Sequence, residues 1–289
     1  MKTKRILLTG ILGIALAGFV LTGCHKASTS PDSDITAAQD DANATYASND
    51  AKSVSDAAMQ QNGHSPFNFS SYYNATITWA RDTGNGDTLY IQFPSTPTYC
   101  GDGRYRQGEI IVYWPRISLG YLWQAYLDSN VTITELFRGY AVGNSASNMN
   151  AISGTRTWTN EGHNVGGYEN WNFTANLTIT YPGGKTATWT STRNNVLTQV
   201  SGIWYYSITG NAYGTSRNGI GYTLSITSPL YITAAPWWAG GCAWIEAGTV
   251  SVNRTSSSNT LTINFGNIGN CDANAVATIN GTNYPFTMW

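Results

Sequence analysis

The stretch WNFTANLTITYPGGKTATWTST, residues 171–192, decides the fold class. In its first half every second residue is apolar and Asn or Thr lies between; the apolar positions are Trp171, Phe173, Ala175, Leu177, Ile179 and Tyr181. A period of two residues is typical of a β-strand with one face buried and the other in water. Pro182-Gly183-Gly184 is a turn signal, and the alternation resumes through Ala187 and Trp189. The stretch therefore predicts an antiparallel hairpin.

The same alternation continues through most of the chain after about residue 67. It recurs in Ala75/Ile77/Trp79, Leu89/Ile91/Phe93, Trp204/Tyr206/Ile208, Tyr222/Leu224/Ile226 and Leu261/Ile263/Phe265. Asn280-Gly281 near the end is a strong hairpin signal. About a dozen such segments at regular spacing, without helical patterns between them, predict a mostly β domain over residues 67–289. We expect an antiparallel meander, a sandwich or a half-barrel.

An outer-membrane barrel is the alternative to this domain, because the chain ends in an aromatic residue, Trp289. A lipid-facing strand would carry apolar residues at every second position before it. Thr287, Pro285 and Asn283 occupy those positions. The pattern therefore favours a β domain outside the bilayer.

The amino terminus has the pattern of an export signal. MKTKR, residues 1–5, is basic, and residues 6–21 are uncharged and mostly apolar. This arrangement is typical of a signal peptide, and the apolar run is short for a membrane span. Leu21-Thr22-Gly23-Cys24 resembles the lipobox of bacterial lipoproteins. The resemblance implies cleavage between Gly23 and Cys24, lipid on Cys24, and attachment to the outer membrane; periplasm-facing and surface-exposed placements both fit. Cleavage by an ordinary signal peptidase, with Cys24 left free, is the alternative.

Between the signal peptide (1–23) and the β domain lies a polar segment, residues 24–66. Its first part, HKASTSPDSD (25–34), is typical of a flexible tether. The part after it has a weak apolar stripe and could form one short helix, with Asp34 as its cap and Gly63 as its end. Disorder of the same residues is the alternative.

Composition excludes some partners and some chemistry. After removal of the signal peptide, 12 basic residues face 16 acidic ones, a net charge of −4, so no basic footprint for nucleic acid is present. His163 is the one histidine within the β region, and no G-x-S-x-G occurs, so neither a histidine metal site nor a serine triad is predicted. We expect no metal and no cofactor.

Three cysteines remain once Cys24 carries lipid: Cys100, Cys242 and Cys271. No C-x-x-C spacing is present, which argues against zinc or redox chemistry, and export permits a disulfide. Cys242 and Cys271 lie close to the two ends of one predicted hairpin. We therefore expect these two to pair.

The sequence supports two hypotheses about function. In the first, the domain is a non-catalytic module for binding, adhesion or scaffolding in the cell envelope, with a glycan or an envelope protein as partner; Trp237 and Trp238 are the candidate sugar-stacking residues. In the second, it is a lipid-anchored polysaccharide hydrolase, which needs two carboxylates about 5–10 Å apart. Glu109, Glu135 and Glu246, all within predicted strands, are the candidate acids. Glu246 is favoured because it lies among aromatic residues. We expect no catalytic residue.

Three cysteine-centred phrases carry a family resemblance: CGDGR (100–104), GCAWIEAG (241–248) and CDANA (271–275). Together with the lipobox they are similar to a group of Bacteroidota lipoproteins with no established activity. The resemblance implies an exported lipoprotein with a long antiparallel β domain. Gly101 and Ala273 depart from the pattern of that group. From the residues alone, Asp102-Gly103 is a turn pair, and we expect Arg104 to pair with a carboxylate on a strand.

Overall fold

The structure is a computed structural model, and it describes residues 32–60, 68–82, 86–115, 128–235, 241–242 and 244–288. Strands make up most of it. The helices are α1 (Thr36–Gln60) and α2 (Phe69–Tyr73). The strands are β1 (Thr76–Asp82), β2 (Gly86–Gln92), β3 (Thr98–Tyr99), β4 (Tyr105–Trp114), β5 (Thr132–Ser145), β6 (Asn148–His163), β7 (Glu169–Thr180), β8 (Thr186–Val200), β9 (Ile203–Thr215), β10 (Gly221–Thr233), β11 (Ala247–Arg254), β12 (Leu261–Asn264), β13 (Asn274–Ile279) and β14 (Thr282–Thr287).

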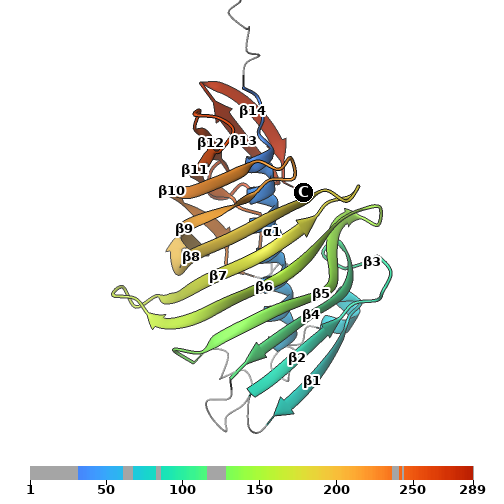
Figure 1. Ribbon diagram of the computed structural model, residues 1–289. Helices are drawn as coiled ribbons and strands as arrows, with labels where there is room; N and C mark the ends of the chain where they lie inside the picture. The colour runs from blue at the N-terminus through green and yellow to red at the C-terminus, as the bar shows by residue number, and fades with distance from the viewer. Residues whose placement is uncertain are drawn as a thin grey trace, which may run out of the picture. The chain divides into compact units, whose positions relative to one another are not determined.

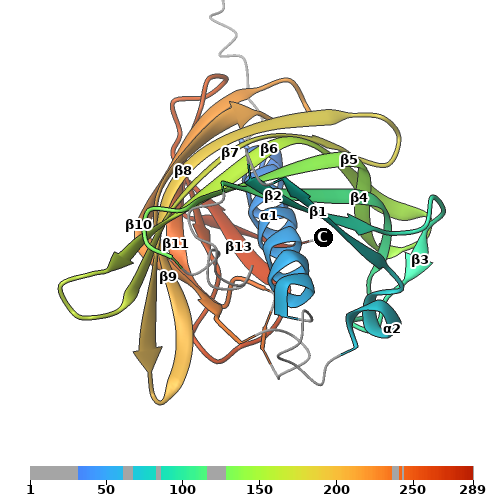
Figure 2. The same ribbon diagram turned by 90° about the horizontal axis from the view of Figure 1, so that it is seen from below.

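All the described strands belong to one antiparallel sheet. Their order follows the chain from β1 to β14, except that β3 lies off this path and pairs with β4. The order ends at β1 and at β14, so the sheet is open, and it curls around α1 (Figures 1 and 2). This confirms the mostly β antiparallel prediction, and of the expected architectures the sheet is a meander.

The hairpin predicted from residues 171–192 is β7 paired with β8. Leu177 lies opposite Trp189, and both side chains are buried. The turn between the strands is closed by the amide of Gly184, which donates to the carbonyl of Tyr181 at 3.0 Å. The predicted turn at Asn280-Gly281 is also present, with positive φ at both residues, as the favoured two-residue hairpin turn requires.

A bulge helps to bend the sheet. The pairing of β4 with β5 shifts register between Gln107 and Glu109, and Gly108 between them has φ +81°. A Cβ at Gly108 would collide with the carbonyl oxygen of Gly139. Bulges increase the local twist of a strand, so this glycine permits the curvature that brings β4 around the helix.

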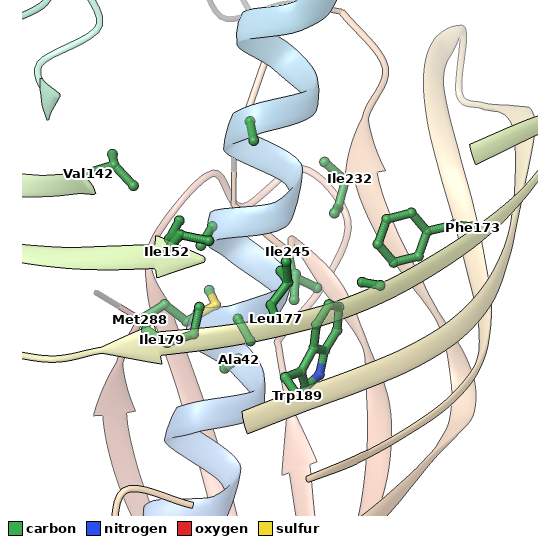
Figure 3. Packing of buried hydrophobic residues seen from close by; sticks show 14 of the residues in the cluster. Ala42, Val142, Ile152, Phe173, Leu177, Ile179, Trp189, Ile232, Ile245 and Met288 are labelled. Carbon is green, nitrogen blue, oxygen red and sulfur yellow. The ribbon is translucent and has the colours of Figure 1, made fainter. Parts of the chain in front are cut away.

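Helix α1 occupies the concave side of the sheet and forms the centre of the core. Its buried apolar residues include Ala37, Ala38, Ala42, Ala44, Ala47, Ala51, Val54, Ala57 and Ala58. Figure 3 shows Ala42 facing Leu177, Ile179 and Trp189 of β7 and β8. Because alanine side chains are small, strands approach the helix closely from several directions.

Of the two alternatives for the residues after Asp34, a helix is present: α1 has 25 residues and lies between Asp34 and Gly63. It differs from the prediction in belonging to the compact unit Asp32–Trp289 rather than to a tether. Of the flexible segment predicted over 25–34, Asp32 is held by Arg254 and Ser257, and residues 25–31 lie outside the described residues. Asp34 acts at the helix start as expected, accepting from the amide of Thr36 at 2.9 Å. Gly63, the predicted end, lies outside the described residues.

Candidate functional site

Arginines of the strands and of the β9–β10 turn bind carboxylates of the helical segment along its length. The closest approaches are Arg254 Nη2–Asp32 Oδ2 at 2.6 Å, Arg217 Nε–Asp40 Oδ1 at 2.7 Å, Arg193 Nη2–Asp41 Oδ1 at 3.8 Å and Arg106 Nη2–Asp50 Oδ1 at 2.6 Å. Removing one partner of a buried ion pair leaves an uncompensated charge, which is strongly destabilising. These pairs therefore fix the position of the helix along the sheet.

The densest of these clusters joins Asp50 to Asp102, Arg104 and Arg106. Arg106 Nη2 lies 2.6 Å from both Asp50 Oδ1 and Asp102 Oδ2, and Arg104 Nη1 lies 2.9 Å from Asp102 Oδ2. Burial alone would raise the pKa of Asp102, but the two guanidinium groups hold it at about 2. The predicted partner of Arg104 was a strand carboxylate. Its actual partners are Asp102, in the turn before β4, and Asp50 on α1.

Each of the three candidate catalytic glutamates is bound by protein groups. Glu109 accepts from Gln92 Nε2 at 3.0 Å and pairs with Arg138 at 2.9 Å. Glu135 is fully buried, pairs with Arg156 and accepts from Ser55. Burial raises the pKa of Glu135. These contacts tie strands and helix together, which is a structural role.

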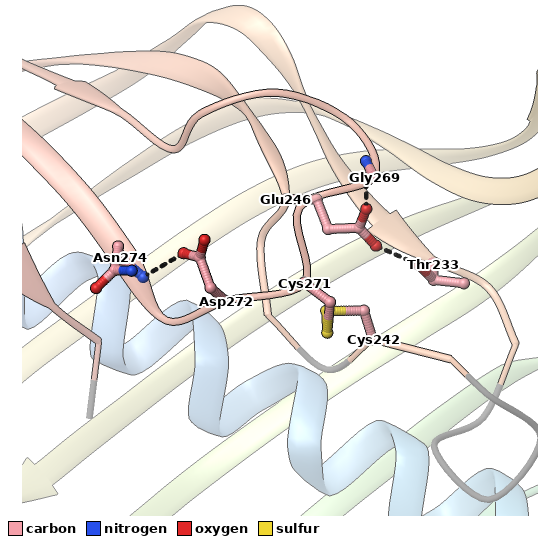
Figure 4. Close-up of a disulfide and its surroundings, with 7 residues drawn as sticks. All are labelled: Thr233, Cys242, Glu246, Gly269, Cys271, Asp272 and Asn274. Carbon is pink, nitrogen blue, oxygen red and sulfur yellow. Dashed lines mark hydrogen bonds between the residues drawn. A yellow bond between two sulfur atoms is a disulfide. The ribbon is translucent and has the colours of Figure 1, made fainter.

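Glu246, the favoured acid, also holds the fold together (Figure 4). Its Oε2 accepts from the amide of Gly269 at 2.8 Å, and its Oε1 accepts from Thr233 Oγ1. The prediction that it lies within a strand is wrong, since it precedes the first residue of β11. Its carboxylate joins the end of β10 to the loop between β12 and β13.

The disulfide predicted between Cys242 and Cys271 is confirmed, with a Cα–Cα distance of 5.6 Å (Figure 4). Cys242 precedes β11 and Cys271 follows β12, so the bond closes the base of the β11–β12 hairpin, as the sequence argument assumed. Cys100 is a buried free thiol that donates to the carbonyl of Tyr73 at 3.1 Å.

The candidate stacking residues Trp237 and Trp238 lie outside the described residues. Another aromatic pair is exposed at the tips of neighbouring hairpins. Tyr168, in the loop between β6 and β7, is 39% exposed, and Trp204, at the start of β9, is 42% exposed. Their ring centroids are 6.1 Å apart in an edge-to-face arrangement. Asn164 orders the loop by accepting from the amide of Tyr168 at 3.0 Å.

The rings continue inward from this pair along the concave face. Tyr206 lies two residues beyond Trp204 on the same strand, so both side chains are on one face. Lys52 of α1 lies among the deeper rings, with Nζ 5.4 Å from the centroid of Tyr206, 6.0 Å from Trp171 and 5.8 Å from Trp158. We call these rings the aromatic strip: Tyr168, Trp204, Tyr206, Trp171 and Trp158. The strip is exposed at the hairpin tips, and its inner rings surround the ammonium group of Lys52.

The sequence contained a signal for this strip that our prediction did not use. Trp204, Tyr206 and Ile208 alternate along one predicted strand, and this alternation alone does not separate buried rings from exposed ones. Trp204 is only one residue from the Ser201-Gly202-Ile203 turn, and residues beside hairpin turns are often exposed. That position marks Trp204 as the member of the series to reach solvent.

Within the ranges that the structure describes, no three His, Cys, Asp or Glu side chains gather as metal ligands. Neither described helix has the length and apolar character needed to cross a membrane. Comparisons with protein-family models, curated proteins and solved structures find no match for this chain.

Proposed function

We propose that this chain is a lipid-anchored lipoprotein of the bacterial cell envelope, and that its β domain is a non-catalytic module that binds a glycan at Tyr168 and Trp204. The observation that carries the proposal is the position of this pair. The pair lies at one end of the long strands. The contacts of Asp32, the first residue of the compact unit, lie at the other end.

The anchor-proximal edge is defined by the contacts of Asp32. Its carboxylate accepts from Arg254 Nη2 at 2.6 Å and from Ser257 Oγ at 2.8 Å, where β11 turns into β12. Cys24 precedes Asp32 by eight residues, and eight extended residues span at most about 28 Å. A lipid on Cys24 would therefore keep this edge close to the membrane surface.

The aromatic pair lies at the other end of the long strands. The 15 residues of β8 run from Thr186, beside the anchor-proximal turns, to Val200, beside Trp204. At about 3.3 Å per residue, this strand separates the two edges by about 45 Å. The aromatic pair and the contacts of Asp32 therefore lie at opposite ends of the long strands.

The chemistry at the tips suits a neutral, hydroxylated ligand. Exposed rings offer apolar faces on which sugar rings can stack, and Gln199, directly across from Trp204, offers an amide. Ile203 is exposed beside them. The engagement of Glu109, Glu135 and Glu246 in structural contacts supports a binding role over hydrolysis.

The experiment is a glycan array followed by affinity electrophoresis in the polysaccharides that give signal. Trp204→Ala is expected to reduce retardation at least tenfold. Tyr213→Ala is the matched control, because Tyr213 is 59% exposed on the same strand but lies one residue out of phase with Trp204, on the other face. It should leave binding unchanged. Binding to no glycan, or equal losses in both variants, would refute the glycan proposal.

The anchor is tested separately by membrane fractionation and palmitate labelling of the bacterial host. Cys24→Ala is expected to abolish label and to move the protein to the soluble fraction. A labelled Cys24→Ala protein would contradict lipidation at this residue while leaving the glycan result intact.

A further inference from the structure

A small cavity lies between the middle of α1 and the concave face of the sheet. It is lined by Thr45, Ser48, Asn49, Lys52, Arg156, Phe173, Trp189, Arg193, Asn195 and Ile208. Its volume is about 10 Å³, which is room for about one water-sized particle. An organic ligand does not fit while the helix is in place.

The polar groups around this cavity are mostly donors. Among the described residues, Asn49 Nδ2, Arg156 Nη2 and Arg193 Nε are buried without a hydrogen-bond partner. Asn195 Oδ1 is the one unpartnered acceptor in the lining. Buried polar groups are nearly always paired, so this excess of N–H groups indicates a ligand that accepts hydrogen bonds.

The two arginines come from different strands and each retains an unused donor. Arg156 lies on β6. Its Nε is 2.5 Å from Glu135 Oε2, and its Nη1 donates to Ser48 Oγ at 3.0 Å. Arg193 on β8 donates from Nη2 to Thr45 Oγ1 at 2.9 Å, while its carboxylate partner Asp41 is 3.8 Å away. Their remaining N–H groups are not satisfied by the helix.

The direction of the arginine pKa shift differs between this cavity and the Asp50 cluster. Burial lowers the pKa of both Arg156 and Arg193 from the ordinary value, despite Glu135 and Asp41. For Arg106, burial acts in the same direction, but Asp50 and Asp102 raise its pKa well above the ordinary value. Glu135 and Asp41 therefore stabilise the charged forms of Arg156 and Arg193 less than Asp50 and Asp102 stabilise that of Arg106.

We propose that this cavity binds one small monovalent anion, with chloride as the ligand, held between Arg156, Arg193 and Asn49. The anion bridges β6, β8 and α1, and so fastens the middle of the helix to the sheet. A cation is disfavoured by the three basic side chains of the lining.

The test uses the mature protein in buffers of constant ionic strength in which sodium gluconate is replaced stepwise by sodium chloride. A ligand that binds only the folded state raises Tm by mass action. We expect a saturable rise of about 3 °C at ten times the dissociation constant. Crystals grown in sodium bromide should show an anomalous peak between Arg156 and Arg193.

Asn49→Asp supplies a carboxylate at the cavity and is expected to abolish the chloride response. Asn148→Asp, at an exposed position on β6, should retain it. A Tm that does not depend on chloride, a bromide peak found only elsewhere, or an unchanged response in Asn49→Asp would each overturn the proposal. The bromide measurement does not depend on the folding of any variant.

Discussion

Replacing Asp50 by Asn removes one negative charge from the buried cluster and preserves the size of the side chain. Asp50 is almost fully buried. It accepts from Arg106 Nη2 at 2.6 Å, Arg106 Nε at 3.3 Å and Tyr140 Oη at 3.2 Å, and Arg104 Nη1 lies 3.5 Å away. The variant leaves two buried guanidinium groups to share one carboxylate, Asp102.

The expected loss of folding free energy follows from the removal of one of the two carboxylates that the arginines share. Removing one member of a buried ion pair costs about 3–5 kcal/mol. Asp102 still binds both arginines, and the Asn oxygen can accept one of the lost hydrogen bonds. We therefore expect the lower end of the range, about 3 kcal/mol in the free energy of unfolding.

The assay is urea unfolding at pH 7, followed by tryptophan fluorescence and circular dichroism. The matched control is Glu161→Gln on β6, which changes an exposed carboxylate that accepts from Asn172 Nδ2 at 2.8 Å and should cost less than about 0.5 kcal/mol. Similar small losses in both variants, below about 0.5 kcal/mol, would refute the conclusion that the buried ion pairs hold the helix.

Three further predictions concern the disulfide, pH and Glu246. Reducing Cys242–Cys271, which are 29 residues apart in sequence, should lower stability by about 3 kcal/mol, measured as the urea midpoint with and without dithiothreitol; an unchanged midpoint would contradict this. Because the folded pKa of Asp102 is about 2 against an ordinary 3.8, its contribution is present above about pH 4 and is lost as pH falls through 2, costing about 2 kcal/mol. Unfolding curves at pH 5, 4, 3 and 2 check this, and a constant midpoint below pH 4 would exclude it. Glu246→Ala should cost about 2 kcal/mol, since it removes the hydrogen bonds that Glu246 accepts from Gly269 N and Thr233 Oγ1. Polysaccharide hydrolysis that disappears in Glu246→Gln would count against the non-catalytic proposal.

The sheet could be predicted because its signal is local. Each strand alternates apolar and polar residues within its own ten or so positions, and turns such as Asn280-Gly281 carry their own preference for positive φ. The pairing of Cys242 with Cys271 could be predicted for a similar reason, since both flank one hairpin.

The burial of α1 could not be predicted, because its partners are distant in sequence. Asp41 meets Trp189 and Arg193 about 150 residues away, and Asp32 meets Arg254 after 222 residues. An Ala-rich helix with interspersed Asp has a weak stripe, which is equally typical of a solvated linker. The usable signal lay in the strands, where Arg156 and Arg193 occupy the same alternation phase as the apolar Trp158 and Trp189. An arginine on the buried face requires a buried partner. The helix supplies Asp41 to Arg193, whereas Arg156 pairs with Glu135 of the neighbouring strand β5 and takes only Ser48 from the helix.

Hydrogen–deuterium exchange of the segment 36–60 tests the central claim most directly. If α1 is the centre of the core, amides from Ala42 to Val54 should exchange only through global unfolding, as slowly as those of β7 and β8. Exchange of these amides within seconds, while β7 and β8 stay protected, would show that the segment is a tether and would contradict the account.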